Sequence, residues 1–141
     1  MRANFSWNIR VYYEDTDAGG IVYYANYLKF FERARTEWLR ASGVDQQVLS
    51  ETHGVMFVVK RTAMDYHAPA KLDDELIVTV NVRRMGRASV EFAQEAWRID
   101  GSADAGRVLL ASGEIRVGCV GAASLRPQAI PDETAMKIAA G

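Results

Sequence analysis

The segment richest in chemistry runs from Arg10 to Tyr27 and carries three carboxylates, Glu14, Asp15 and Asp17, between a predicted strand and a predicted helix. The pair Gly19–Gly20 follows them and allows a ligand to approach the backbone closely. A helix start has unpaired N–H groups and a dipole that favours negative charge. These features suit a carbonyl oxygen that becomes an oxyanion during acyl transfer. A neighbouring carboxylate could attack such a carbonyl or activate a water molecule.

The same residue types also have a structural explanation. Asp and Thr residues before a helix commonly form caps and Asx-turns, and composition alone favours capping for Thr16 and Asp17. A calcium loop fits less well, because it needs a ligand at Gly19 and a glutamate at Asn26. A glycosidase pair also fits poorly, because Asp15 and Asp17 share one short loop instead of facing each other across a cleft.

Other candidate nucleophiles have weaker settings. Cys119 lies in a strand pattern and is expected to be a small core residue. The two histidines, His53 and His67, fall in a presumed turn and at a strand end, and no serine has a Gly-x-Ser-x-Gly setting. By elimination, hydrolytic chemistry in this chain would depend on a carboxylate.

Basic residues cluster around one predicted turn. Arg83, Arg84 and Arg87 flank a glycine there, and Ser89 follows. A solvated surface is the simpler explanation, above all for Arg83. Arg84, Arg87 and Ser89 would equally suit the phosphates of a nucleotide.

Composition limits the classes of function. The chain has 141 residues, 49% hydrophobic and 25% charged, with a net charge of −1, which fits one soluble domain and no general attraction to nucleic acid. No apolar run approaches the ~20 residues needed to cross a bilayer, so no membrane insertion is expected. The single cysteine and the absence of an apolar leader favour the cytoplasm.

The periodicity predicts an α+β fold. Alternation predicts a strand over Trp7–Tyr13, and spacings of three and four predict a helix over Ala25–Ala41. Four further strands are predicted within residues 55–66, 76–82, 90–96 and 109–117. Short turns between them imply antiparallel pairing. Residues 1–141 are expected to form one domain, with about 122–141 as a loosely held extension that ends in a helical turn at 133–140.

One helix can cover only one face of such a sheet. The other face is expected to show Val58, Ile77 and Trp97, and exposed apolar surface usually marks an association site. A homo-oligomer, at least a dimer, is therefore expected.

The run from Arg10 to Tyr27 resembles the signature of the 4-hydroxybenzoyl-CoA thioesterase family. The continuation through residues 28–37 and the later stretch 66–74 resemble its branch associated with the Tol-Pal cell-envelope system. The resemblance implies the hotdog fold, in which a curved five-stranded antiparallel sheet wraps a long central helix. It also implies a homodimer or homotetramer with sites at the subunit interface, where the phosphate contacts of one subunit serve the acyl pocket of the other.

The resemblance assigns roles to individual residues. Asp17 matches the catalytic aspartate, Tyr24 matches the residue whose backbone N–H binds the thioester carbonyl, and Gly20 lies in the loop that leads to it. The coenzyme A phosphates are expected at Arg84, Arg87 and Ser89. In the Tol-Pal branch the position of Tyr24 is commonly a histidine, whereas the aromatic-CoA enzyme has a tyrosine. This departure leaves the backbone role intact and the substrate preference open.

The expected activity is hydrolysis of short-chain, aromatic or longer acyl-CoA to a free acid and coenzyme A, with no metal or other cofactor. An acyl carrier protein is a further expected partner. One alternative is a non-catalytic acyl-CoA or acyl-carrier binding protein associated with the cell envelope. Another is a cell-envelope interaction protein with no turnover.

Overall fold

The computed structural model describes residues 5–100 and 106–140 of the chain. Its elements, in chain order, are β1 (Phe5–Arg10), the 3-10 turn η1 (Tyr13–Asp15), α1 (Asn26–Ala41), α2 (Gln46–Val48), the π-helical turn η2 (Leu49–His53), β2 (Val55–Tyr66), β3 (Glu75–Met85), β4 (Ser89–Ile99), β5 (Arg107–Gly121) and α3 (Asp132–Ala140).

The five strands form one sheet in the order β1-β3-β4-β5-β2, and every neighbouring pair is antiparallel. Alternate residues of β3 and β4 are buried, as expected for strands that cover a core with one face. β2 is a long edge strand, and a register shift lies between Val59 and Arg61. The short strand β1 forms the other edge.

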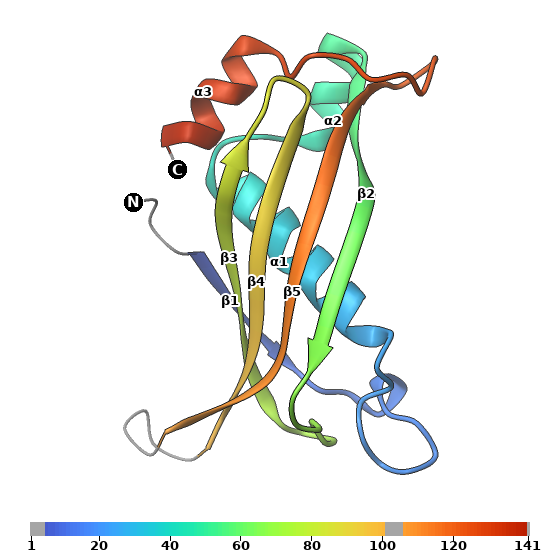
Figure 1. Cartoon of the computed structure of the whole chain (residues 1–141), viewed down its shortest axis with the longest axis vertical. Helices are drawn as coiled ribbons and strands as arrows, with labels where there is room; N and C mark the ends of the chain where they lie inside the picture. Colours follow the sequence, from blue (N-terminus) through green and yellow to red (C-terminus); the bar gives the residue numbers. More distant parts are fainter. Residues whose placement is uncertain (1–4, 101–105, 141) are drawn as a thin grey trace.

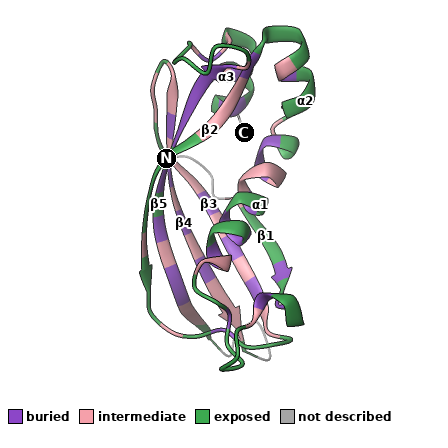
Figure 2. Ribbon diagram, turned by 90° about the vertical axis from the view of Figure 1, so that its right-hand side faces the viewer, coloured by how far each residue is buried: buried purple, intermediate pink, exposed green. Residues whose placement is uncertain are grey.

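Helix α1 lies across one face of the curved sheet (Figure 1, Figure 2). Its apolar residues recur at spacings of three and four and therefore share one face. The buried members are Tyr27, Phe30, Phe31, Ala34, Trp38 and Leu39. They pack on the core positions of the central strands, so the sheet fixes where the N-terminus of α1 lies.

The sheet face away from α1 differs from the expectation of an apolar surface. Ile77 and Trp97 are half-buried there. Ile77 and Trp97 pair with each other, and their other partners are Asn8 and Leu109. Farther along this face the residues are mostly polar, including Thr79, Asn81, Glu91, Glu95, Glu114 and Arg116. An antiparallel sheet can face water in this way, so this face gives no apolar argument for association.

The segment after Ala122 is packed, not loose. The backbone N–H of Gln128 donates to Cys119 over 3.0 Å, and that of Ile130 donates to Arg87 over 2.9 Å. Ile130 and Ile138 are buried in the core. Helix α3 therefore covers one end of the sheet (Figure 1).

The predicted turn at residues 100–106 lies mostly outside the described residues. In the described part of the chain, no helix is long and apolar enough to cross a membrane.

Candidate active site

The loop between β1 and α1 is a tight backbone hairpin. Thr16 and Val22 form an isolated antiparallel bridge, and Ile21 bridges to Lys71. The N–H of Asp17 donates to Ile21 over 2.8 Å, and the N–H of Gly20 donates to Asp17 over 3.0 Å. Gly20 has φ +80°, a conformation that favours glycine. The loop therefore holds Asp17 at a defined place ahead of the helix.

The Asp17 carboxylate is exposed and forms an Asx-turn. Its Oδ1 accepts the N–H of Gly19 over 2.8 Å. Asp17 is not the cap of α1, because the N-cap residue is Ala25 and no side chain caps the helix. Among the described residues, Oδ2 of Asp17 has no hydrogen-bond partner. One oxygen thus orients the carboxylate while the other remains accessible.

The buried carboxylate of this loop is Asp15, whose role the sequence did not reveal. Its Oδ2 accepts the N–H of Tyr12 over 2.9 Å, and its backbone oxygen accepts the N–H of Tyr23 over 3.0 Å and the Asn26 side chain over 2.8 Å. Asp15 therefore fastens the loop to the start of α1. The side chain that caps a helical turn in this loop is therefore that of Asp15, which bonds the backbone at the start of η1. Composition had favoured Thr16 and Asp17 for this role.

The start of α1 presents free donors. The N–H groups of Tyr24 and Ala25 make no hydrogen bond to any described residue. Such groups carry the positive end of the helix dipole. They can donate to a carbonyl oxygen that gains negative charge.

Three tyrosines gather beside these donors. The Tyr66 ring lies 5.8 Å from the Tyr24 ring and 5.7 Å from the Tyr27 ring, measured between centroids. Tyr24 and Tyr66 are exposed, whereas Tyr27 is buried. Burial raises the pKa of Tyr27. Within the described residues, Tyr27 Oη makes no hydrogen bond.

The arginine turn lies far from this loop in one chain. Ser89 and Val58 both pair with Gly118, so the turn is level with Val58, whereas Tyr24 contacts Tyr66 at the other end of β2. The eight residue steps from Val58 to Tyr66 span about 26 Å of strand, which is the approximate separation between the arginine turn and the Asp17 loop. Figure 1 shows the β3–β4 turn and the β1–α1 loop at opposite ends of the sheet.

The side chains of the turn have different settings. Arg84 lies on the sheet face away from α1, beside Glu91 of β4, and Arg87 is exposed at the tip. The N–H of Gly86 donates to the Ser89 carbonyl over 2.8 Å, and the Ile130 N–H donates to Arg87. A backbone hydrogen bond joins Gly20 to Asp17, and Tyr24 lies where the same loop runs into α1. Arg84, Arg87 and Ser89 lie at the other end of the sheet.

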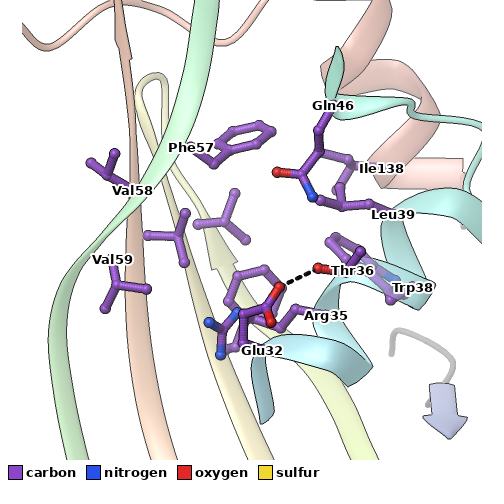
Figure 3. A pocket seen from close by; sticks show the side chains of 13 residues that line it. Glu32, Arg35, Thr36, Trp38, Leu39, Gln46, Phe57, Val58, Val59 and Ile138 are labelled. Atoms are coloured by element: carbon purple, nitrogen blue, oxygen red, sulfur yellow. Dashed lines mark hydrogen bonds between the residues drawn. The ribbon is translucent and has the colours of Figure 1, made fainter. Parts of the chain in front are cut away.

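A cavity of about 130 Å³ lies between α1 and β2 (Figure 3). Its walls are mostly apolar and include Leu39, Phe57, Val59, Phe92 and Ile138. Three polar residues of α1, Glu32, Arg35 and Thr36, also line it. Glu32 accepts the Thr36 hydroxyl over 2.6 Å.

The other candidate nucleophiles lie elsewhere. Cys119 is buried, and burial raises the pKa of its thiol. His67 Nε2 lies 2.9 Å from the Ser112 hydroxyl at the end of β2. Among the described residues, no hydrogen bond joins Cys119 or His67 to the Asp17 loop or to the start of α1.

The chain resembles several characterised proteins. The family model described as Thioesterase superfamily matches residues 19–105. An acyl-CoA thioesterase YbgC of Haemophilus influenzae is 46% identical over 129 residues, which cover 92% of this chain and 90% of that protein. A probable thioesterase from Bartonella henselae is 29% identical with a TM-score of 0.76, and the match covers 92% of this chain and 100% of that one.

A 4-hydroxybenzoyl-CoA thioesterase variant, solved with 4-hydroxybenzoyl-CoA, is 16% identical with a TM-score of 0.85 over 96% of this chain and 98% of that one. At this identity the likeness shows the fold alone, and it confirms the hotdog architecture. The family match begins two residues after Asp17 and contains Gly20, Tyr24 and the arginine turn. The chain belongs to the thioesterase superfamily.

Proposed function

We propose that this chain hydrolyses acyl-coenzyme A, with Asp17 as the catalytic carboxylate and the Tyr24 N–H as the donor to the thioester carbonyl. The observation that carries the proposal is that the N–H groups of Tyr24 and Ala25 bond to no residue in the described part of the chain and follow a loop that holds a carboxylate. Relatives named acyl-CoA thioesterases, at up to 46% identity, support the substrate class.

The reaction needs two groups at the carbonyl. Donation from the Tyr24 N–H stabilises the oxyanion formed when a nucleophile adds to the carbonyl carbon. Asp17 either removes a proton from the attacking water or attacks the carbonyl itself. On the water route, collapse of the intermediate breaks the carbon–sulfur bond, and the proton taken from water passes to the sulfur, so the products are the free acid and coenzyme A as a thiol. On the direct route, collapse leaves a mixed anhydride with Asp17. A water molecule then hydrolyses this anhydride to the free acid and the Asp17 carboxylate, and the proton released goes to the coenzyme A thiolate.

The binding of coenzyme A requires a second subunit in this proposal. Arg84, Arg87 and Ser89 lie about 26 Å from the Asp17 loop along β2. Antiparallel association of two β2 edges would place the arginine turn of one subunit level with the Asp17 loop of its partner. A homodimer joined at β2 is therefore the smallest assembly that unites the two halves of the site, and two such dimers would make a homotetramer.

An acyl carrier protein is a further proposed partner, because the exposed arginines at and beside the turn would suit an acidic surface. The link to the Tol-Pal system and a cytoplasmic location stay predictions from the sequence.

Hydrolysis in ¹⁸O-labelled water tests the activity. The proposal predicts equal release of thiol and free acid, with label incorporated from the water. Label recovered in Asp17 after one turnover supports covalent attack, whereas label confined to the acid fits an activated water. Binding of acyl-CoA without any thiol release would contradict the proposal and favour a non-catalytic binding protein.

A further inference from the structure

Arginine side chains cross the sheet face away from α1 in a single row. Arg61 of β2 pairs with Arg116 of β5. Across the next two strands, Arg116 pairs with Glu91, and Glu91 pairs with Arg84. Ile115, next to Arg116, is buried in the core, so Arg116 and its partners in the row point to the opposite face. We call Arg84, Glu91, Arg116 and Arg61 the arginine row.

The charges of the arginine row are unpaired within the described part of the chain. The side chains of Arg61, Arg84 and Arg116 make no hydrogen bond or salt bridge there, and neither does that of Glu91. Arg61 and Arg116 stand directly opposite each other, and like charges in that position destabilise a sheet. An arginine keeps its charge in proteins, so a bound anion would relieve this repulsion.

A hollow of about 330 Å³ lies over the row, within the range of sites that bind small molecules. Two further charged residues line it, Arg83 and Glu114, whose side chains form a salt bridge of 3.3 Å. The hollow thus has four arginines and two glutamates, which leaves a net charge of +2. Its two apolar residues, Phe92 and Ile115, are buried in the core, so the wall that a ligand meets is charged.

The spacing of the arginines favours phosphate groups joined in a chain. A guanidinium group binds phosphate through two parallel N–H groups. Neighbouring strands lie about 4.8 Å apart, so Arg61 and Arg116 can share one phosphate. Arg84 lies two strands from Arg116, about 10 Å away, and can contact another phosphate of the same ligand. A charged wall offers little to an acyl group or a nucleobase, so the phosphate chain itself is the part recognised.

We propose that the arginine row binds a free oligophosphate, at a site separate from the one proposed for the phosphates of coenzyme A at the turn. Arg87 and Ser89 of the turn are not among the described residues that line the hollow. Arg84 is the residue that the two sites have in common. The proposal does not depend on hydrolysis by Asp17, because it concerns binding at the outer face of the sheet.

Calorimetric titration with tripolyphosphate at low ionic strength tests the site in the wild type, Arg61→Gln and Arg116→Gln. Glutamine keeps a polar side chain and removes the charge. We expect saturable binding by the wild type and a loss of about tenfold or more in affinity in each variant, because each loses hydrogen bonds between charged groups. Orthophosphate should bind the wild type at least about tenfold more weakly than tripolyphosphate, because it cannot reach Arg84 and Arg61 together.

Two further charge changes serve as controls. Glu91→Gln removes the carboxylate between Arg84 and Arg116 and should raise the affinity for tripolyphosphate about threefold or more. Arg33→Gln removes an exposed arginine of α1, on the other side of the sheet, and should leave the affinity unchanged. Circular dichroism verifies that each variant is folded. A fall in affinity for Glu91→Gln would contradict the proposal.

Titration with coenzyme A distinguishes the two sources of phosphate. Arg61→Gln should lower the affinity for coenzyme A by less than about twofold, as expected for a separate site. Equal losses of affinity for both ligands would assign the row to the substrate and overturn the proposal. Absence of saturable tripolyphosphate binding by the wild type would overturn it too, as would an equal loss in Arg33→Gln. Each of these results leaves thioester hydrolysis to be decided by its own assay.

Discussion

One oxygen of the Asp17 carboxylate serves the loop, and we propose the other for chemistry. The Asx-turn to Gly19 explains why residue types alone favour a structural role for Asp17. The loop position and glycine content could be predicted from the sequence. The buried role of Asp15 could not, because it depends on bonds to Tyr12 and Asn26 that form only in the folded loop.

Gly20→Ala tests how far the loop conformation matters. Gly20 has φ +80° and open space where a Cβ would lie, so alanine introduces backbone strain without a clash. We expect a loss of about 1 kcal/mol in the free energy of unfolding and a lower kcat/KM. Gly54→Ala is the control, since Gly54 has φ +65° and equally open surroundings outside the loop. It should lose similar stability in denaturant titrations and retain activity; equal activity losses in both variants would contradict a specific role for the loop.

Tyr27→Phe removes a buried hydroxyl that has no hydrogen-bond partner among the described residues. At neutral pH we expect stability to stay equal or rise by up to about 1 kcal/mol, because phenylalanine leaves no polar atom to desolvate. Burial raises the pKa of Tyr27 above its ordinary value of 10.0. The native state therefore holds this proton more tightly than the unfolded state, and its contribution to stability is present below pH 10 and lost as the pH rises.

Urea titrations from pH 9 to 11 measure this dependence. The free energy of unfolding should fall more steeply with pH in the wild type than in Tyr27→Phe. Parallel curves would show that the Tyr27 hydroxyl is not buried as described.

At the scale of the elements, the periodicity of hydrophobic residues predicts the helix and the strands. It does not predict segments whose order depends on packing against distant parts of the chain. The predicted helix matches α1, and the four later predicted strands lie within β2 to β5, because the period of the hydrophobic residues follows from which face is buried. The first strand was predicted over Trp7–Tyr13, whereas β1 spans Phe5–Arg10 and Tyr13 begins η1. The predicted loose extension has no such pattern over residues 122–131. Its order comes from bonds to β5 and the β3–β4 turn and from burial of Ile130 and Ile138.

Ile138→Ala tests whether α3 is part of the core. Ile138 is 1% exposed, whereas Met136 of the same helix is 72% exposed. We expect Ile138→Ala to lower the free energy of unfolding by about 2–5 kcal/mol and Met136→Ala to change it by less than about 0.5 kcal/mol. Similar small effects in chemical denaturation would mean that the segment is loosely held after all.

At the scale of the whole molecule, one chain carries the Asp17 loop and the arginine turn, the two halves of the proposed site, at opposite ends of its sheet. The sequence resemblance implies that two subunits share each site. The register of β2 gives a physical reason, because it keeps the arginine turn far from the Asp17 loop of the same chain. The outer sheet face is mostly polar, so the free edge of β2 is the surface that best supports association. Strand pairing of this kind depends on a second chain and cannot be deduced from hydrophobic period alone.

Mixing two inactive variants tests the shared site. Asp17→Asn disables one half and Arg87→Ala the other, so a mixed dimer has one site with both defects and one intact site. Random reassociation should restore about a quarter of the wild-type kcat/KM. No recovery after mixing, with subunit exchange verified by mass spectrometry, would mean that each site draws both halves from one chain.

The most direct test of the central claim is thiol release from a panel of acyl-CoAs by the wild type, Asp17→Asn and Glu14→Gln. Asparagine keeps the shape and the Asx-turn acceptor of Asp17 but removes its charge, and Glu14 is an exposed carboxylate nearby in the same loop. The account predicts that Asp17→Asn stays folded and loses roughly 10²-fold or more in kcat, while Glu14→Gln retains activity. Full activity in Asp17→Asn would show that Asp17 only shapes the loop and would contradict the account.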